Sequence, residues 1–301
     1  MIKLSTHWLK IENGRIFIRQ WQSKRQPNGV IHILHGMMEH SGMYQEWAKH
    51  LCLLGWDVIC HDHPGSGYTI AKGCHLDHLP KGGDKLLIQT TTIIDSWIRQ
   101  RYPNLPIIRY GHSMGAFLAL NFKQDELTSN GIILTGTTYE PMAVLMIQSY
   151  LVRALGTLRG IKKPSKLGHA IAISSLNRSF KKATSPFEWV SRMPKVIHQY
   201  ENDPLCGNVA SWGYYQALTN MLIDMVSVKD TLFPPILCLT GEKDPLSNGG
   251  KKIKPLLKKL TPLTSDLKHV IVPGAHHKIE SDEKTSFVLA AINEFLAKVK
   301  Q

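Results

Sequence analysis

The sequence predicts an α/β protein with a mostly parallel, eight-stranded sheet and helices on both faces. Short apolar runs rich in β-branched residues alternate with amphipathic stretches along most of the chain, as in parallel β-α-β units. The alternation stops after Gly136 and resumes at Pro235, which indicates an insertion between two strands. With 301 residues, 43% of them apolar, the chain can form one such domain with a sizeable core.

The first part of the chain contains most of the predicted sheet. Its expected elements are strands at 8–11, 15–21 and 30–34, a helix at 44–54, a strand at 57–61, a helix at 81–101, a strand at 107–110, a helix at 114–123 and a strand at 132–134. Asn13-Gly14 separates the first two strands, as in a tight hairpin. In the helix at 81–101, Leu87, Ile94 and Ile98 recur at helical spacing and should be buried.

The rest of the chain completes the sheet after a helical insertion. Residues 137–230 are mostly helical and basic in pattern, and we expect them to form a lid, while 1–136 and 231–301 form the core. Strands follow at 235–240 and 269–272, and a last helix spans 283–299, with Phe287, Ala291, Phe295 and Leu296 expected on its inner face. Ligands of open α/β sheets bind at the carboxyl ends of the strands, so a lid over that edge would cover the active site.

We expect a cytoplasmic setting, because the sequence shows no targeting signal and its cysteines do not suggest disulfides. The N-terminus lacks the apolar run and cleavage site of a signal peptide, and no stretch reaches the roughly 18 apolar residues of a membrane span. Of the five cysteines, Cys52, Cys60 and Cys238 lie in apolar runs, as small buried hydrophobic residues do.

The formal net charge of +13 is concentrated in two regions. Ten Lys/Arg and one acid, Glu188, lie between Arg153 and Lys195, and a second basic cluster runs from Lys251 to Lys268. Neither carries interleaved aromatic residues or a recognition-helix pattern, so no nucleic-acid partner is expected. A peripheral contact with an anionic membrane, an acidic partner, or a merely solvated basic face remain open.

The strongest chemical motif is Gly111-His112-Ser113-Met114-Gly115. It matches G-x-S-x-G between a predicted strand and a predicted helix, which is the elbow that exposes the nucleophilic serine in the α/β-hydrolase fold. The helix N-terminus behind the serine favours developing negative charge. Ser113 is therefore the predicted nucleophile; the alternative is a structural serine in a tight turn.

A serine nucleophile needs a base and an acid that orients the base. In this fold the chain order is Ser, Asp or Glu, then His. Asp244 follows the strand that ends at Thr240 and is the predicted acid, with Glu140 as the second choice. His276 and His277 follow the last strand, and their chemistry alone does not distinguish between them.

The tetrahedral oxyanion needs backbone donors, which this fold takes from the residue after the nucleophile and from the loop after the third strand. These are Met114 and Met37, the latter after His35-Gly36. The list of expected substrate-contacting residues is His35, Gly36, His112 and Leu145. No metal or cofactor is expected.

The motifs resemble those of the monoacylglycerol lipase and bacterial lysophospholipase family, also called serine aminopeptidase-like hydrolases. The matching segments are the His35–Tyr44 loop (H-G-x-x-E-H-S-x-x-Y), the 111–115 elbow, the Gly241–Asp244 acid loop, Gly274–His277 (G-A-x-H) and Asn202–Leu205. The resemblance covers nearly the whole chain and places the catalytic histidine at His277.

One loop departs from the family pattern. The family usually has D-x-R-G-H-G-x-S after its fourth strand, whereas this chain has Asp62-His63-Pro64-Gly65-Ser66-Gly67-Tyr68. The arginine and the second histidine are replaced. This loop borders the expected site, so the family's substrate preference does not transfer directly.

The resemblance implies hydrolysis of acyl esters of glycerol or of lysophospholipids, which would be small-molecule substrates. The 142–158 stretch is apolar and is followed by basic residues; it could lie on a membrane surface, line an acyl tunnel or pack on the core. Three rival functions remain: an acyltransferase or aminopeptidase with the same triad, a non-catalytic ligand-binding protein, and a charge-driven surface-binding protein.

Overall fold

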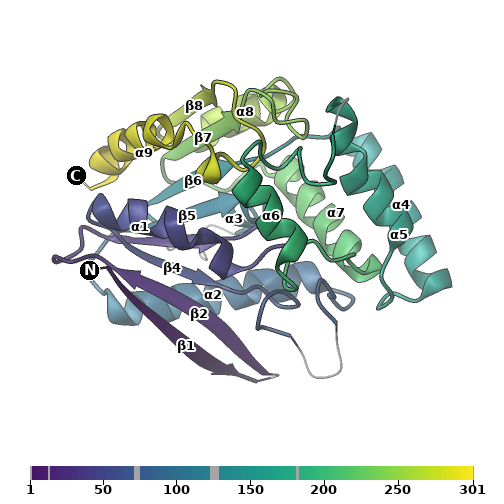
Figure 1. Cartoon of the computed structure of the whole chain (residues 1–301), viewed down its shortest axis with the longest axis horizontal. Helices are drawn as coiled ribbons and strands as arrows, with labels where there is room; N and C mark the ends of the chain where they lie inside the picture. Colours follow the sequence, from purple (N-terminus) through teal and green to yellow (C-terminus); the bar gives the residue numbers. More distant parts are fainter. Residues whose placement is uncertain (1, 13, 71–74, 123–128, 181–182, 301) are drawn as a thin grey trace.

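The computed structural model describes residues 2–12, 14–70, 75–122, 129–180 and 183–300 of the chain (Figure 1). Asn13 of the expected hairpin and residue 123, the end of the helix expected at 114–123, lie outside these ranges. All statements below concern the described residues.

The described strands form one eight-stranded sheet in the order β1-β2-β4-β3-β5-β6-β7-β8. Its strands are β1 (Lys3–Ile11), β2 (Gly14–Gln22), β3 (Val30–Leu34), β4 (Asp57–His61), β5 (Ile107–His112), β6 (Gly131–Thr135), β7 (Ile236–Gly241) and β8 (Leu267–Val272). β1 and β2 pair antiparallel, β2 pairs antiparallel with β4, and all other pairs are parallel. The predicted α/β-hydrolase fold with a mostly parallel eight-stranded sheet is confirmed.

Burial explains why the central strands have continuous apolar sequences. Every residue of β3, β4, β5, β6 and β7 is buried, because helices cover the faces of a parallel sheet. β1 alternates exposed and half-buried residues, as a strand at the sheet edge with one solvated face does. The carboxyl ends of the parallel strands consequently meet at a single edge.

Helices follow the strands on both sides of the sheet; in Figure 1, α1 and α9 lie in front of it and α2 behind. The described helices of this core are α1 (Gln45–Leu53), α2 (Gly83–Arg101), α3 (Met114–Ala119), α8 (Lys254–Leu260) and α9 (Thr285–Val299). Leu87, Ile94 and Ile98 of α2 are fully buried, as predicted.

Helical elements also fill the segment between β6 and β7. They are α4 (Met142–Arg159), α5 (Lys166–His169), the helical turns 170–174 and 176–179, α6 (Pro194–Asn202) and α7 (Trp212–Ser227). α7 packs against α2 and α3 of the core, and α4 packs against α7. In Figure 1 these helices gather at one end of the sheet. We call residues 137–230 the cap segment; its action as a lid stays a prediction.

The inner face of α9 was predicted wrongly at one position. Phe287 is 43% exposed, while Val288, Ile292, Phe295 and Leu296 are buried. The buried residues repeat at i, i+4, i+7 and i+8, and Phe287 lies about 100° around the helix from Val288. The helical period therefore outweighs the hydrophobicity of a single side chain.

Two further sequence-based expectations can be compared with the structure. Cys52, Cys60 and Cys238 are free and buried, as predicted. None of the described helices combines the length and the apolar character needed to cross a bilayer.

Candidate active site

The elbow between β5 and α3 holds Ser113 in a strained conformation. Ser113 has φ +54° and ψ −117°, a region that non-glycine residues rarely adopt and that recurs at functional sites. Its amide donates to Thr135 O at 2.9 Å, so the neighbouring strand fixes the turn. The serine is half-buried, whereas His112 and Met114 on either side are buried.

The two glycines of the elbow are required by close backbone contacts. A Cβ at Gly111 would lie 2.3 Å from Gly115 O, and one at Gly115 would lie 1.9 Å from Leu34 O. The contacting atoms belong to the backbone and cannot move aside. These glycines therefore let α3 begin directly against β3 and β5, with the serine between them.

Asp244 and His277 meet behind the carboxyl ends of β7 and β8. His277 Nδ1 lies 3.1 Å from Asp244 Oδ1. Asp244 also accepts from Leu246 N at 2.9 Å and from Ser247 Oγ at 3.0 Å, and both partners of the pair are buried. Burial alone would raise the pKa of Asp244, but the charge and hydrogen bond of His277 outweigh it and lower the pKa. The carboxylate is thus held ionised and fixed in orientation.

The alternative acid and the alternative base point elsewhere. Glu140 pairs with Lys252 at 2.6 Å on the surface. His276 Nδ1 hydrogen-bonds Glu188 O at 2.7 Å, and its ring contacts Phe180. Within the described residues the pair that the sequence favours, Asp244 and His277, is the one that the structure brings together.

On the side away from Asp244, the His277 ring is buried. Its Nε2 has no hydrogen-bond partner among the described residues. The ring lies against Trp189 of the cap segment and against His112, each at 4.9 Å between centroids. His112 directly precedes Ser113 in the chain, and no hydrogen bond joins Ser113 to His277 in the described structure. Catalytic hydrogen bonds often form only when substrate is bound.

Two amides near Ser113 lack acceptors. Among the described residues no hydrogen bond is assigned to Met37 N–H or Met114 N–H. Met114 is the first residue of α3, whose first amides have no partner within the helix. The position that a Cβ of Gly36 would occupy is 3.2 Å from Ser113 Cβ, so the peptide joining Gly36 to Met37 passes beside the serine. Met37 N–H therefore lies beside the elbow and Met114 N–H within it, and their role as an oxyanion site stays a prediction.

His35 holds this peptide rather than facing outward. Its Nε2 accepts from His63 N at 3.0 Å, so Nδ1 carries the proton and donates to Gly36 O at 2.8 Å. Gly36 C=O and Met37 N–H belong to one peptide plane, and this hydrogen bond orients that plane. Burial lowers the pKa of His35 and keeps it neutral. Both ring nitrogens are thus engaged within the protein, and the predicted substrate contact of His35 stays a prediction.

Glu39 fixes the same loop from the other side. It accepts from Gly36 N at 2.5 Å and from the hydroxyls of Tyr44 and Tyr200, the latter at 2.8 Å. It also pairs with Lys278. All these side chains are buried. The Lys278 charge outweighs the effect of burial and holds the pKa of Glu39 far below its usual range. Glu39 therefore ties the His35 loop to the residue after His277.

His112 is part of a second buried polar group. Its Nδ1 lies 2.9 Å from Thr135 Oγ1 and 3.3 Å from Glu280 Oε1. Glu280 also accepts from Tyr110 at 2.7 Å and Thr135 at 2.6 Å. Burial opposes ionisation, but the proximity of His112 leaves the pKa of Glu280 at about 2. These contacts fix the position of the His112 ring beside His277.

The apolar residues of α4 divide into one buried and several exposed positions. Leu145 is fully buried in the main core, which leaves its predicted substrate contact untested. The exposed residues, which we call the α4 stripe, are Val144, Met146, Ile147, Tyr150, Leu151 and Leu158. Most of the helix's large apolar side chains therefore do not pack on the core.

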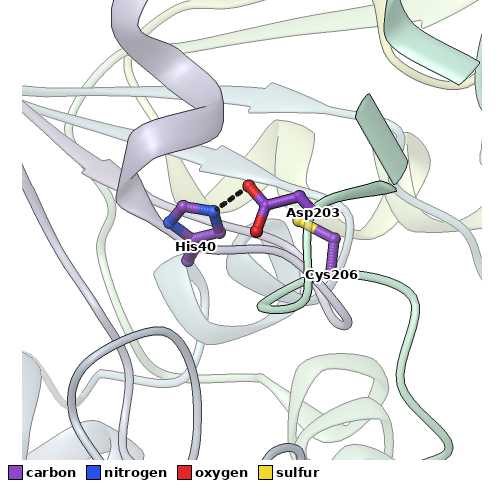
Figure 2. A group of neighbouring side chains, drawn as sticks. All are labelled: His40, Asp203 and Cys206. Atoms are coloured by element: carbon purple, nitrogen blue, oxygen red, sulfur yellow. Dashed lines mark hydrogen bonds and ion pairs between the residues drawn. The ribbon is translucent and has the colours of Figure 1, made fainter. Parts of the chain in front are cut away.

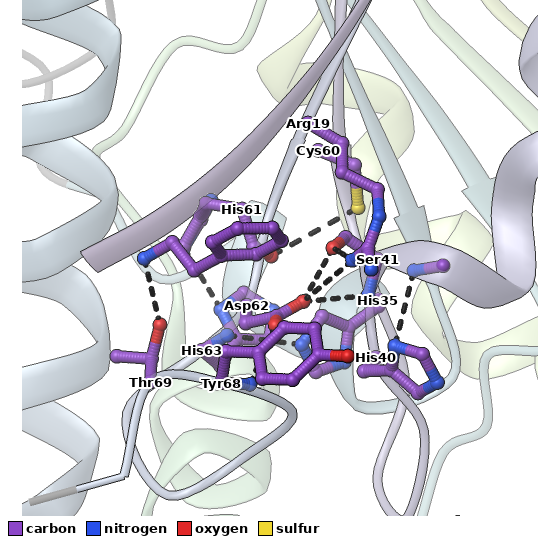
Figure 3. Close-up of polar contacts among 12 residues, drawn as sticks. Arg19, His35, His40, Ser41, Cys60, His61, Asp62, His63, Tyr68 and Thr69 are labelled. Atoms are coloured by element: carbon purple, nitrogen blue, oxygen red, sulfur yellow. Dashed lines mark hydrogen bonds and ion pairs between the residues drawn. The ribbon is translucent and has the colours of Figure 1, made fainter. Parts of the chain in front are cut away.

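The loop that departs from the family pattern is held by Asp62 (Figure 3). Its carboxylate accepts from Ser41 N and Tyr68 N, each at 2.8 Å, and lies 3.8 Å from the Arg19 guanidinium. Gly67, with φ +52°, leaves room for that carboxylate, since a Cβ there would be 2.1 Å from Asp62 Oδ2. The loop is thus ordered by its first residue and by the His35 loop.

His40, Asp203 and Cys206 form the one group of potential metal ligands found among the described residues (Figure 2). His40 Nδ1 accepts from Gly42 N at 3.2 Å, so Nε2–H donates to Asp203 at 3.0 Å. Burial raises the pKa of the Cys206 thiol well above its usual range, and metals bind the thiolate. The potential ligand atoms of His40 and Asp203 are therefore engaged in hydrogen bonds, and the Cys206 thiol is protonated. The His40–Asp203 contact joins the His35 loop to the end of α6.

Several residues of the site were not singled out from the sequence. Glu39, Tyr44 and Asp203 lie in segments that carried the family resemblance, so a signal existed. Lys278 and Glu280 follow His277 by one and three residues without a motif of their own. Trp189 is a cap residue in a segment with no periodic pattern, and nothing in the sequence places it over His277.

An elbow serine, a histidine–carboxylate pair behind it and two free amides on an α/β-hydrolase fold define a serine hydrolase of carboxylic esters. The chain belongs to a specific family of this class: residues 25–284 match the family described as "Serine aminopeptidase, S33", which includes monoglyceride lipases and related phospholipases.

Individual relatives agree with this placement. The chain is similar to a monoglyceride lipase of Rattus norvegicus, 26% identical, covering 97% of this chain and 89% of that protein. It is also similar to phospholipase YtpA of Bacillus subtilis, 26% identical over 78% of this chain and 82% of that protein. A carboxyl esterase from Bacillus coagulans shares the fold with a TM-score of 0.85 at 19% identity over the full length of both chains.

Proposed function

We propose that this enzyme hydrolyses long-chain monoacyl esters of glycerol, either monoacylglycerols or lysophospholipids, with Ser113, His277 and Asp244 as its triad. The observation that supports these roles is the hydrogen bond between Asp244 and His277. Asp244 engages His277 Nδ1 at 3.1 Å, which leaves Nε2 as the nitrogen that can take a proton, and that nitrogen is buried without a partner among the described residues.

The reaction follows from this arrangement. Ser113 Oγ attacks the ester carbonyl carbon while His277 Nε2 takes the hydroxyl proton, and Asp244 stabilises the imidazolium. Collapse of the tetrahedral intermediate breaks the acyl carbon–oxygen bond, and His277 returns the proton to the departing alcohol. Water then attacks the acyl-enzyme by the same route and releases a fatty acid.

The amides of Met37 and Met114 would bind the oxyanion. One such donor is typically worth about 10²–10³ in rate. The supporting observation is that both donors are unpaired beside Ser113 and that His35 and Glu39 hold the Gly36–Met37 peptide from two sides.

The substrate class rests on two observations. The relatives are named for monoglycerides and phospholipids, and the α4 stripe is an exposed apolar surface with Arg153 and Arg159 on the same helix. Such a helix can lie on an anionic interface. We therefore place the enzyme at the surface of membranes, from which a single-chain ester can enter under the cap segment.

A chain-length series tests this proposal. Wild type and Ser113→Ala are compared on p-nitrophenyl esters from acetate to palmitate, and then on 1-monooleoylglycerol and lysophosphatidylcholine. We expect kcat/KM to rise with chain length and activity to disappear in Ser113→Ala. The two natural esters decide the head group.

Three outcomes would contradict the proposal. Equal or better turnover of acetate than of the longer esters would remove the lipid assignment. Failure of a fluorophosphonate probe to label wild type would remove the triad and favour a non-catalytic binding protein. Release of amino acids from aminoacyl anilides, with no ester turnover, would instead favour an aminopeptidase.

A further inference from the structure

A chain of buried histidines runs from the far side of the sheet to the candidate oxyanion loop. His32 in β3 lies between Asp95 of α2, at 2.7 Å, and His61 of β4, at 3.0 Å. His61 Nε2 in turn lies 3.0 Å from His63 Nδ1. All three imidazoles have no exposed surface. Such a row of polar groups inside the core is costly unless each member is paired.

Asp95 is already paired with a buried cation. It binds the Arg109 guanidinium on Oδ2, while His32 lies on Oδ1. An imidazolium at His32 would bring a second buried positive charge to the same carboxylate. Burial also lowers the pKa of His61 and of His63 well below the usual range. We therefore infer an uncharged ring at each of the three positions.

Neutrality fixes every proton in the chain. His32 Nδ1–H donates to Asp95, so its Nε2 can only accept, and it accepts from His61 Nδ1–H. His61 Nε2 must then accept from His63 Nδ1–H. The chain ends at His63 Nε2, a buried lone pair with no partner among the described residues. All three rings are thus in the Nδ1–H form, whereas free histidine in water prefers Nε2–H.

The last member reaches the oxyanion loop. The His63 ring contacts the His35 ring at 4.1 Å between centroids, with the two planes tilted by 43°. The backbone N–H of His63 is the donor that sets the His35 tautomer (Figure 3). His35 then holds the carbonyl of the peptide that carries Met37 N–H. A path of hydrogen bonds and one ring contact therefore connects Asp95 to the candidate oxyanion donor.

We propose that Asp95, His32, His61 and His63 are positioning residues that lock the His35 ring and, through it, the Met37 amide in its catalytic orientation. The kinetic part of this inference rests on the proposed ester hydrolysis. The tautomer part does not, because it concerns the resting protein. None of these side chains needs to touch the substrate.

The tautomers can be read directly. In uniformly ¹⁵N-histidine-labelled protein, two-bond ¹H–¹⁵N correlation spectra assign each ring nitrogen as protonated or not. We expect Nδ1–H for His32, His61, His63 and His35. Nε2–H at His61 and His63 would mean that His32 is charged or that the chain is reversed, and would overturn the proposal.

Breaking the anchor tests the coupling. In His32→Leu we expect the Nδ1–H preference of His61 to be lost. We also expect kcat on a soluble ester to fall about tenfold with little change in KM, since a misplaced oxyanion donor weakens only the transition state. His63→Phe retains an aromatic ring beside His35 and should therefore lose less kcat than His63→Ala. Rates are normalised to the fraction of enzyme that a fluorophosphonate probe labels, so that misfolded protein is not counted.

The matched control is His269→Gln. It removes a half-buried histidine of β8 that is hydrogen-bonded to Thr240 of β7 at 3.1 Å. It should leave kcat and the tautomers of the chain unchanged. Unchanged kcat in His32→Leu with altered tautomers, or an equal loss in His269→Gln, would refute the positioning role. Absence of any ester turnover in wild type would refute the proposed function and leave the tautomer result intact.

Discussion

Ser113 combines local strain with a polar task, and its surroundings supply the compensation. A non-glycine residue at such a φ costs of order 1–3 kcal/mol. The Ser113 N–H bond to Thr135 and the close packing of Gly111 and Gly115 hold the turn. The strain keeps the hydroxyl outside the helix that follows and beside the His35 loop, where a reacting carbonyl can be placed between nucleophile and amides.

Asp244→Asn tests the orienting role of the carboxylate. The amide keeps the shape but removes the charge and allows the wrong His277 tautomer, so kcat should fall by about 10³–10⁴ with a small change in KM. The measurement is a full kinetic curve on a soluble ester. The control Glu140→Gln removes the rival acid and should leave kcat unchanged; the reverse pattern would exchange the two assignments.

Asp77 should make stability depend on pH. It is buried, has φ +53°, and its Oδ2 has no partner among the described residues. Burial raises its pKa to about 8, against the smaller opposing effect of the Met38 amide. The folded state therefore keeps a proton that the unfolded chain releases, and stability is lost as pH rises from about 4 to about 8.

Asp77→Asn should remove this loss, because asparagine is neutral and tolerates the same backbone. Between pH 5 and pH 9 we expect the unfolding free energy of wild type, measured in urea, to fall relative to that of the variant by about 4 kcal/mol, since each pH unit below the raised pKa is worth about 1.4 kcal/mol. Asp230→Asn, at an exposed carboxylate, is the control and should change neither value. A gain that is equal at both pH values would contradict the ionisation argument.

At the scale of elements, α4 has a buried side and an exposed side, and the α4 stripe lies on the exposed side. Leu145, Ser149 and Gly156 are buried toward the protein, while Ile147 and Tyr150 are 63% and 74% exposed. Large contiguous apolar surface on a monomer marks an interaction site. One side of the helix therefore packs on α7, and the exposed side is the surface that we propose contacts a membrane.

Ile147→Glu/Tyr150→Glu should weaken binding to anionic vesicles at least about tenfold, because burying a carboxylate in the interface is unfavourable. Turnover of a soluble short-chain ester should stay within twofold, since these side chains point away from the core. Co-sedimentation with phosphatidylglycerol vesicles measures the first effect. Leu53→Glu, at a 74% exposed leucine of α1, is the matched control; equal losses in both proteins would point to a nonspecific charge effect.

The sequence predicted the elements with strong local patterns and failed where tertiary contacts decide. The buried strands and the elbow followed from apolar runs and from a motif between a strand and a helix. Motif order gave Asp244, and the family resemblance gave His277 in preference to His276. Phe287 was placed inward because hydrophobicity was weighted above the helical period. The contact of Trp189 with His277 and the His32–His61–His63 chain depend on which strands become neighbours and on where an aperiodic cap segment lies, and no local pattern encodes either.

At the scale of the whole molecule, one buried ion pair joins the two ends of the core. Glu39 follows β3 and Lys278 follows β8, and they pair although they are 239 positions apart in the chain. Lys278 also lies 4.2 Å above the Tyr44 ring, and Tyr200 adds a hydroxyl from the cap segment. The Glu39 carboxylate therefore contacts the His35 loop, the residue after His277 and the cap segment.

Lys278→Met should cost about 3–5 kcal/mol of unfolding free energy, because it leaves Glu39 as an uncompensated buried charge. Adding Glu39→Gln to that variant removes the charge and should recover about 1–3 kcal/mol, a coupling expected for groups in direct contact. Urea unfolding of both single variants and the double variant closes the cycle. Lys298→Met, which breaks an exposed 3.3 Å pair with Asp266, should cost no more than about 1 kcal/mol. Additive effects of Lys278→Met and Glu39→Gln would show that the pair does not hold these loops together, and the oxyanion loop would then depend on His35 alone.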